Sequence, residues 1–193
     1  MPILIFNLIW MIYNCLLALF AVIFGYLAFV KGKTFFRPLW MILWLIFLPN
    51  TIYILTDFSH FFEQSPQVPN LLLPLLLFEY VLLFAVGIVT FFASIFLFDS
   101  YLHHLHGIKN KHWTPFVFIA IINLLTSIGV MMGRLQRTNS WEVFTNPLRV
   151  LFDFSVVISN PRTMVFIFTF SILTTTLYYI LKHLGESKRR KQS

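Results

Sequence analysis

The stretch from Leu71 to Phe98 reads LLLPLLLFEYVLLFAVGIVTFFASIFLF, and Glu79 is its only charged residue. A bilayer core about 30 Å thick is crossed by roughly twenty apolar residues in a helix, so this stretch is long enough to span a membrane. Strands of a membrane barrel alternate apolar and polar residues, whereas runs such as Phe116 to Leu125 are almost continuously apolar. The pattern therefore predicts transmembrane helices.

Four other apolar runs of similar length flank this one, each bounded by charged or turn residues. The sequence predicts an all-α polytopic integral membrane bundle that forms a single domain over residues 1–193. The first run lacks a preceding basic region and a small-residue cleavage site, so we expect a retained helix and not a cleaved signal peptide. Asn160 and Pro161 suit the N-cap and first position of the last helix. The predicted spans are residues 3–30, 38–56, 71–98, 114–133 and 161–181.

Composition supports the same class of protein. Of 193 residues, 59% are hydrophobic and 11% are charged, which excludes an ordinary soluble domain and a disordered chain. A single cysteine excludes an internal disulfide scaffold. The net charge of +7 lies in short clusters between apolar runs, so we expect anionic lipid at the membrane surface as the partner, and no nucleic acid.

The basic residues predict an orientation. With five spans, ten of the fourteen lysines and arginines fall on one side of the membrane, which the positive-inside rule makes cytoplasmic. We therefore expect the N-terminus outside and the basic tail 182–193 inside. The ten residues are Lys31, Lys33, Arg37, Lys109, Lys111, Lys182, Lys188, Arg189, Arg190 and Lys191.

The outer segment 134–160 is less loop-like than the other connections. Asn139 followed three residues later by Glu142 resembles a capping box, and Pro147 ends that helix before a second apolar stretch. Trp141 suits the headgroup level. The segment is predicted to lie in the interface or to re-enter the membrane, and a sixth short span is the alternative.

Polar residues cluster near the end of the second span. Pro49 removes a backbone donor and predicts a kink, with Asn50 available to the freed backbone groups. Beyond it, Asp57 and His60 would share a helical face, a spacing that suits a hydrogen-bonded acid and imidazole or two metal ligands. The alternative is a wet helix end where polar residues are ordinary.

Glu79 is predicted to lie below the headgroups on the third span. An intramembrane carboxylate is costly and implies a partner, for which Arg134 or Arg137 is the natural candidate. A structural ion pair or a protonated, hydrogen-bonded Glu79 is the alternative.

The inner loop places Asp99, His103 and His106 at helical spacings of four and three. This spacing suits a metal, but a solvated helix end beside anionic headgroups is favoured because the sequence shows no further ligand.

Two polar blocks, LPNTIYILTD at 48–57 with His60, and GRLQRTNSWE at 133–142, resemble the two signatures of the bacterial membrane family designated domain of unknown function 1361. The resemblance covers most of the chain, although Thr51 and Glu142 stand where a small residue and an aspartate are expected. It implies a bacterial cytoplasmic-membrane protein and brings no established activity.

The sequence contains no zinc, nucleotide or hydrolase motif, so no catalytic residue, metal or cofactor is assigned and an enzyme is not favoured. We expect an outer-face pocket that binds a lipid headgroup, an envelope precursor or a membrane protein partner. One alternative is a membrane enzyme that uses His60 on a lipid-linked phosphate, and another is a proton-coupled carrier that uses Glu79. The predicted ligand-binding residues are Asp57, His60, Glu79, Arg134, Arg137, Asn139, Trp141 and Glu142.

Overall fold

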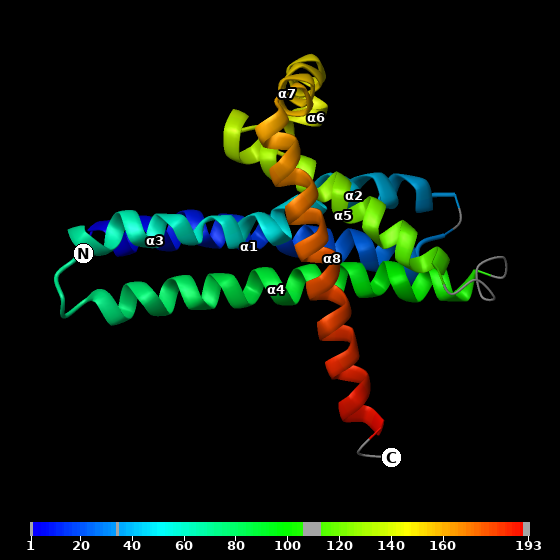
Figure 1. The fold of residues 1–193 in the computed structure, drawn as a ribbon, viewed down its shortest axis with the longest axis horizontal. Coiled ribbons are helices and arrows are strands. Elements are labelled where there is room, and N and C mark those ends of the chain that lie inside the picture. Colours follow the sequence, from blue (N-terminus) through cyan, green and yellow to red (C-terminus); the bar gives the residue numbers. More distant parts are fainter. Residues whose placement is uncertain (1, 34, 106–112, 191–193) are drawn as a thin grey trace. The chain divides into compact units, whose positions relative to one another are not determined.

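The computed structural model describes residues 2–33, 35–105 and 113–190, and every regular element in these ranges is helical (Figure 1). The α-helices are α1 (Pro2–Tyr26), α2 (Arg37–Thr56), α3 (Phe58–Gln64), α4 (Leu73–His104), α5 (Trp113–Met131), α6 (Glu142–Thr145), α7 (Pro147–Ser159) and α8 (Pro161–Arg190). Two π-helical turns, η1 (Leu27–Lys31) and η3 (Met132–Gln136), extend α1 and α5, and a 3-10 turn, η2 (Ser65–Gln67), follows α3.

Within the described residues, five helical stretches are long and apolar enough to cross a membrane, which confirms the predicted all-α polytopic fold. They are Ile3–Lys31, Arg37–Gln67, Leu73–His104, Trp113–Gln136 and Pro161–Ser187. The helices run past the predicted spans because hydropathy marks only the residues suited to hydrocarbon, whereas helical hydrogen bonding continues into the polar flanks. Asn160 accepts a hydrogen bond from the backbone N–H of Arg162 (3.0 Å), as expected for the N-cap of α8.

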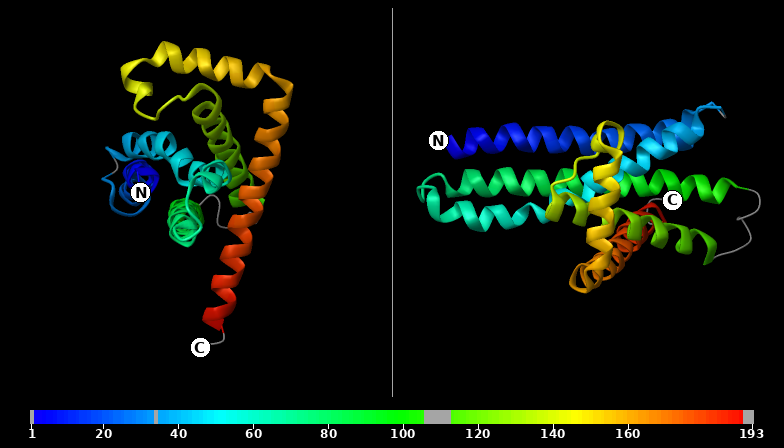
Figure 2. Two further views of the ribbon diagram at one scale, coloured as in Figure 1. Left: turned by 90° about the vertical axis from the view of Figure 1, so that its left-hand side faces the viewer. Right: turned by 90° about the horizontal axis from the view of Figure 1, so that it is seen from above.

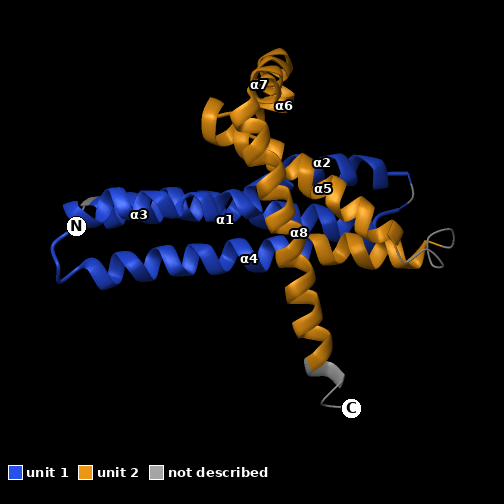
Figure 3. Cartoon of the chain, in the orientation of Figure 1, with its two compact units in different colours: residues 1–94 blue, residues 95–193 orange. Residues whose placement is uncertain are grey.

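The chain divides into two compact units (Figure 3). Unit 1 comprises residues 1–94, and unit 2 comprises residues 95–193. Each unit is described by itself below. The single membrane domain stays a prediction.

In unit 1, α1 runs beside α2 (Figures 1 and 2). Aromatic rings fill the contact: Phe24 stacks on Trp40, and Phe29 meets the buried Trp44 edge-on. Next to Pro49, the Asn50 side chain donates to the Phe47 carbonyl oxygen (2.9 Å). The polar side chain thus serves the backbone of the preceding turn, while the kink itself stays a prediction.

In unit 2, α5 packs against α8, and the Asn123 amide donates to the Thr175 hydroxyl (2.9 Å) across this contact. Figure 2 shows α7 lying crosswise at the N-terminal end of α8. The α7 residue Val157 packs on Met131 and Ile167 of the neighbouring helices. With 13 residues, α7 is about 20 Å long, shorter than a bilayer core of about 30 Å. The interfacial or re-entrant position of the outer segment stays a prediction.

Gly87 lets α4 approach α2 closely. A Cβ atom at this position would lie 2.9 Å from the Thr51 carbonyl oxygen and 3.1 Å from Ile54 Cγ2. Gly87→Ala is therefore expected to lower the stability of the protein by about 1–3 kcal/mol, the usual cost of overpacking. Thermal unfolding in detergent measures this, with Gly185→Ala as the control because its Cβ would meet no atom within 4 Å. Equal stability of the two variants would contradict the close approach.

Candidate functional site

A pair of carboxamides joins α1 to α3 in unit 1. Asn7 Nδ2 donates to Gln64 Oε1 (2.7 Å), and Gln64 Nε2 donates back to Asn7 Oδ1 (3.1 Å). Asn7 is fully buried, so both halves of its amide must find partners inside the protein. This reciprocal pair is the interhelical polar contact that a buried amide needs in a membrane helix.

Aromatic residues surround the amide pair. Trp10 Nε1 donates to Asn7 Oδ1 (3.1 Å), and the Tyr80 hydroxyl donates to Gln64 Oε1 (3.2 Å). The Trp10 ring also lies 6.3 Å from the rings of both His60 and Tyr80. Asn7, Trp10, Gln64, Glu79 and Tyr80 are called the Glu79 cluster below.

Glu79 is the member of this cluster whose hydrogen bonding is incomplete. The Glu79 Oε2 atom is buried and has no hydrogen-bond partner among the described residues. A buried, unsatisfied carboxylate oxygen costs free energy, so this atom calls for a donor from outside the cluster or for a proton.

Negative charge gathers at the same place. Asp57, Glu63 and Glu79 are the three acidic residues of unit 1, and all three interact electrostatically with Tyr80. Glu63 forms an ion pair with His60 (3.0 Å). The cluster therefore offers acceptors and negative charge to a cationic group.

Asp57 and His60 have different partners. The buried Asp57 carboxylate accepts a hydrogen bond from Asn14 (3.4 Å), whereas the half-exposed His60 ring pairs with Glu63. The chain turns at Asp57 between α2 and α3, so the acid–imidazole pair expected from one continuous helical face is not the arrangement found. His60 instead approaches the Glu79 cluster through Trp10.

In unit 2, Asn139 and Glu142 form one half of the predicted capping box, while Trp141 is the residue directly before α6 and no described side chain caps that helix. The Asn139 backbone N–H donates to Glu142 Oε2 (3.0 Å), the reach-back bond of a capping box. Glu142 Oε1 accepts from Arg149 (3.0 Å), which also lies 3.7 Å from Asp153. These two predicted ligand-binding residues thus hold the start of α6 and link it to α7, a structural use of their polar groups.

The carboxylate of α7 faces inward. Asp153 is 4% exposed and accepts a hydrogen bond from Thr138 (2.6 Å). Its helix exposes Leu148, Leu151 and Phe152 on the opposite side. Trp141, the predicted headgroup anchor, is half-buried directly before α6.

Arg137 occupies a strained backbone position. Its φ and ψ angles of 56° and 32° lie in the left-handed region, and its backbone N–H donates to the Met132 carbonyl to close η3. Glycine is the usual residue in this left-handed region, and a residue with a Cβ raises the free energy of the folded protein by roughly 1 kcal/mol relative to glycine. The Arg137 and Arg134 side chains are exposed.

The sequence favoured a solvated helix end for Asp99, and this prediction is wrong because the residue is buried. It is 2% exposed, and its Oδ2 atom accepts from the Tyr178 hydroxyl and from Lys182, both at 2.6 Å. His103 lies 3.3 Å from the other oxygen, and His106 is outside the described residues. Three or more potential metal ligands do not gather anywhere in the described ranges. The cluster is a buried ion pair between α4 and α8 within unit 2.

The eight predicted ligand-binding residues fall into two groups, and their convergence in one pocket stays a prediction, as does the pairing of Glu79 with Arg134 or Arg137. Asp57, His60 and Glu79 belong to unit 1, and the other five belong to unit 2. Sequence reasoning missed Trp10, Gln64 and Tyr80. Asn7 lies in the first predicted span, and only the packing of α3 beside α1 supplies its partner Gln64.

The left-handed backbone at Arg137 makes a testable difference between two variants that both remove the guanidinium. Arg137→Gly is expected to be more stable than Arg137→Ala by about 1 kcal/mol, because glycine has no Cβ to clash in this region. In an ordinary helix the order would be reversed. Thermal unfolding of both variants in detergent measures the difference, and an alanine variant of equal or greater stability would refute the strained conformation.

Comparison with known proteins agrees with this description. A family model described as "Protein of unknown function (DUF1361)" matches residues 13–177, which include most of both units. No curated protein and no solved structure matches the chain. The match covers most of the sequence, and the chain belongs to the DUF1361 family.

Proposed function

We propose that this membrane protein resides in the bacterial cytoplasmic membrane and binds an amine-bearing lipid headgroup on its outer side, with the Glu79 cluster as the recognition site. The observation that carries the proposal is the buried Glu79 Oε2 atom, which has no hydrogen-bond partner among the described residues. A primary ammonium group supplies both the missing donor and a compensating positive charge.

The depth of Glu79 suits a headgroup. Glu79 is six residues from the start of α4, which corresponds to about 9 Å along the helix axis. The whole of α4 has 32 residues and is about 48 Å long, so its first turns extend beyond a hydrocarbon core of about 30 Å. A carboxylate at this level meets the ammonium of a zwitterionic lipid without drawing that group to the membrane centre.

The neighbouring groups favour the same ligand chemistry. The amide oxygens of Asn7 and Gln64 already accept hydrogen bonds from within the cluster, so Glu79 is the acceptor left for a ligand. The rings of Trp10 and Tyr80 offer apolar and π surface beside a cation.

The outer segment of unit 2 extends the proposal. Arg134 and Arg137, with exposed side chains, are proposed to attract lipid phosphate groups at the membrane surface, independently of the amine site in unit 1.

The lipid preference is testable with the purified full-length protein in detergent. Dioleoyl phosphatidylethanolamine should raise the unfolding temperature at a concentration roughly tenfold lower than dioleoyl phosphatidylcholine, whose quaternary amine has no N–H donor. Glu79→Gln should abolish this preference because the charge is lost. Glu186→Gln, which removes an exposed carboxylate in unit 2, is the matched control.

Two results would contradict the proposal: equal stabilisation by both lipids in the wild type, or a preference that survives in Glu79→Gln. Soluble ethanolamine, tested alongside, separates recognition of a free amine from recognition of a lipid. If Glu79→Gln instead abolishes a proton flux into reconstituted vesicles and no lipid preference exists, Glu79 serves proton transport.

The proposed orientation has its own test. Single cysteines at Ser59, Ser140 and Ser187 in a Cys15→Ser background are treated on whole cells with a membrane-impermeant thiol reagent. Ser59 and Ser140 positions should be labelled on intact cells, and the Ser187 position only after lysis. Labelling of Ser187 alone on intact cells would invert the protein and place the Glu79 cluster on the cytoplasmic side.

A further inference from the structure

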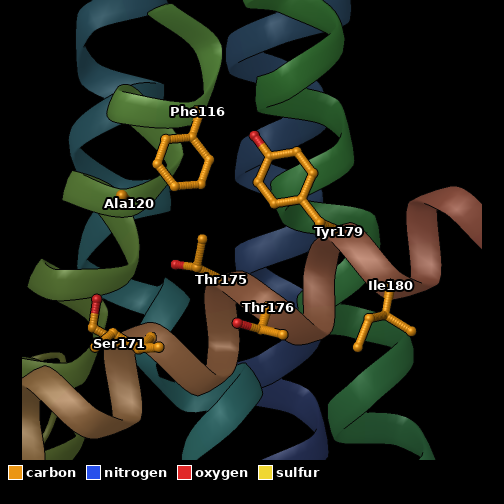
Figure 4. Close-up of a pocket in the computed structure, with 8 residues that line it drawn as sticks. Phe116, Ala120, Ser171, Thr175, Thr176, Tyr179 and Ile180 are labelled. Carbon is orange, nitrogen blue, oxygen red and sulfur yellow. The ribbon is translucent and has the colours of Figure 1, made fainter. Parts of the chain in front are cut away.

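A cavity of about 520 Å³ lies between α5 and α8 in unit 2 (Figure 4). Its walls include Phe116 and Ala120 from α5, and Ser171, Thr175, Thr176 and Tyr179 from α8. Thr176 lines the cavity and is exposed, so the cavity is open to the surroundings of the protein beside this residue. Both helices belong to membrane-crossing stretches, and a lipid in the bilayer can enter from that side.

Three hydroxyl groups on the cavity wall lack partners. Ser171, Thr176 and Tyr179 make no side-chain hydrogen bond to any described residue. Thr174, one residue from the cavity wall, shows the usual alternative: its hydroxyl donates to the Phe170 carbonyl (3.0 Å). In hydrocarbon, a hydroxyl without a partner costs free energy, so these three donors favour a ligand that brings acceptors.

Asn123, next to the cavity-lining residue Thr175, carries another unsatisfied polar atom. Asn123 is fully buried and donates to the Thr175 hydroxyl, but its own carbonyl oxygen has no partner among the described residues. Thr175 accepts this hydrogen bond and keeps its own O–H as a donor, so the cavity wall carries this hydroxyl in addition to the other three.

The position of the cavity along the helices indicates which acceptors would reach it. Phe116 is three residues from the start of α5, about 5 Å along the axis, and Trp113 begins that helix with an exposed ring. Tryptophan is enriched at the membrane interface, where the ester groups of a glycerolipid lie. Ile180 lies at this same end of the cavity and Ile172 about 12 Å further along α8, and both supply apolar surface for an acyl chain.

We propose that this cavity binds one diacylglycerolipid, with its ester carbonyl oxygens accepting hydrogen bonds from Ser171, Thr176 and Tyr179 and one acyl chain between α5 and α8. The cavity volume is in the range typical of small-molecule sites. The site differs from the Glu79 cluster in its unit and in its chemistry, because it recognises carbonyl acceptors and not an amine.

Lipid binding to the intact protein by native mass spectrometry tests this site. The probes are dioleoyl phosphatidylglycerol and the ether-linked analogue with the same headgroup and chain length, which lacks ester carbonyls. Neither probe carries an amine, so their binding does not depend on Glu79. The wild type should bind the ester lipid roughly tenfold more tightly, the equivalent of one to three hydrogen bonds.

Variants separate the two parts of the proposal. The single variant Thr176→Val should lose the ester preference, as should the triple variant that combines Ser171→Ala, Thr176→Val and Tyr179→Phe. Ala120→Phe should weaken the binding of both lipids because the larger side chain fills the cavity. Thr169→Val is the matched control, because Thr169 is an exposed threonine of α8 that does not line the cavity. Equal binding of the two lipids by the wild type, or an ester preference retained in Thr176→Val and in the triple variant, would overturn the proposal.

Discussion

Hydrocarbon offers no hydrogen-bond partner, and this constraint shapes every polar group in the membrane-crossing helices of this protein. Helix formation satisfies the backbone, but side-chain amides, hydroxyls and carboxylates must find one another across helices. Asn7 with Gln64 in unit 1 and Asn123 with Thr175 in unit 2 are solutions of this kind. Each joins residues more than fifty positions apart and holds two helices in register.

Seen against this background, unsatisfied polar atoms are informative. Asp99 is fully occupied at one oxygen by Tyr178 and Lys182, which makes it a structural ion pair. Glu79 Oε2, like Asp99 Oδ1, has no hydrogen-bond partner among the described residues. Asp99, however, also has the Lys182 ammonium group at 2.6 Å and His103 at 3.3 Å, whereas Glu79 forms no ion pair with a described residue. This difference in nearby positive charge is the physical basis for proposing recognition at Glu79.

In the outer segment 134–160, polar side chains pair with residues of the same segment and not across the membrane-crossing helices. Its acidic residues, Glu142 and Asp153, bond to Arg149, Asn139 and Thr138, so they stabilise the connection between α5 and α8. Arg137 stands apart because its backbone is strained and its side chain is exposed. The charged residues of this segment thus include pairs that stabilise the fold and one arginine, Arg137, whose side chain is exposed.

The sequence by itself determined the number of membrane-crossing helices and their approximate bounds, because long apolar runs have few other stable solutions. It also identified Asn139 with Glu142 and Asn160 as helix-start residues, since capping depends on neighbours three residues apart or closer. Only the tertiary structure decided the partners of Asn7, Asp57, Asp99 and the hydroxyls of α8. These partners come from helices distant in the chain, and the packing of whole helices, which local pattern does not encode, brings them within 2.6–3.4 Å.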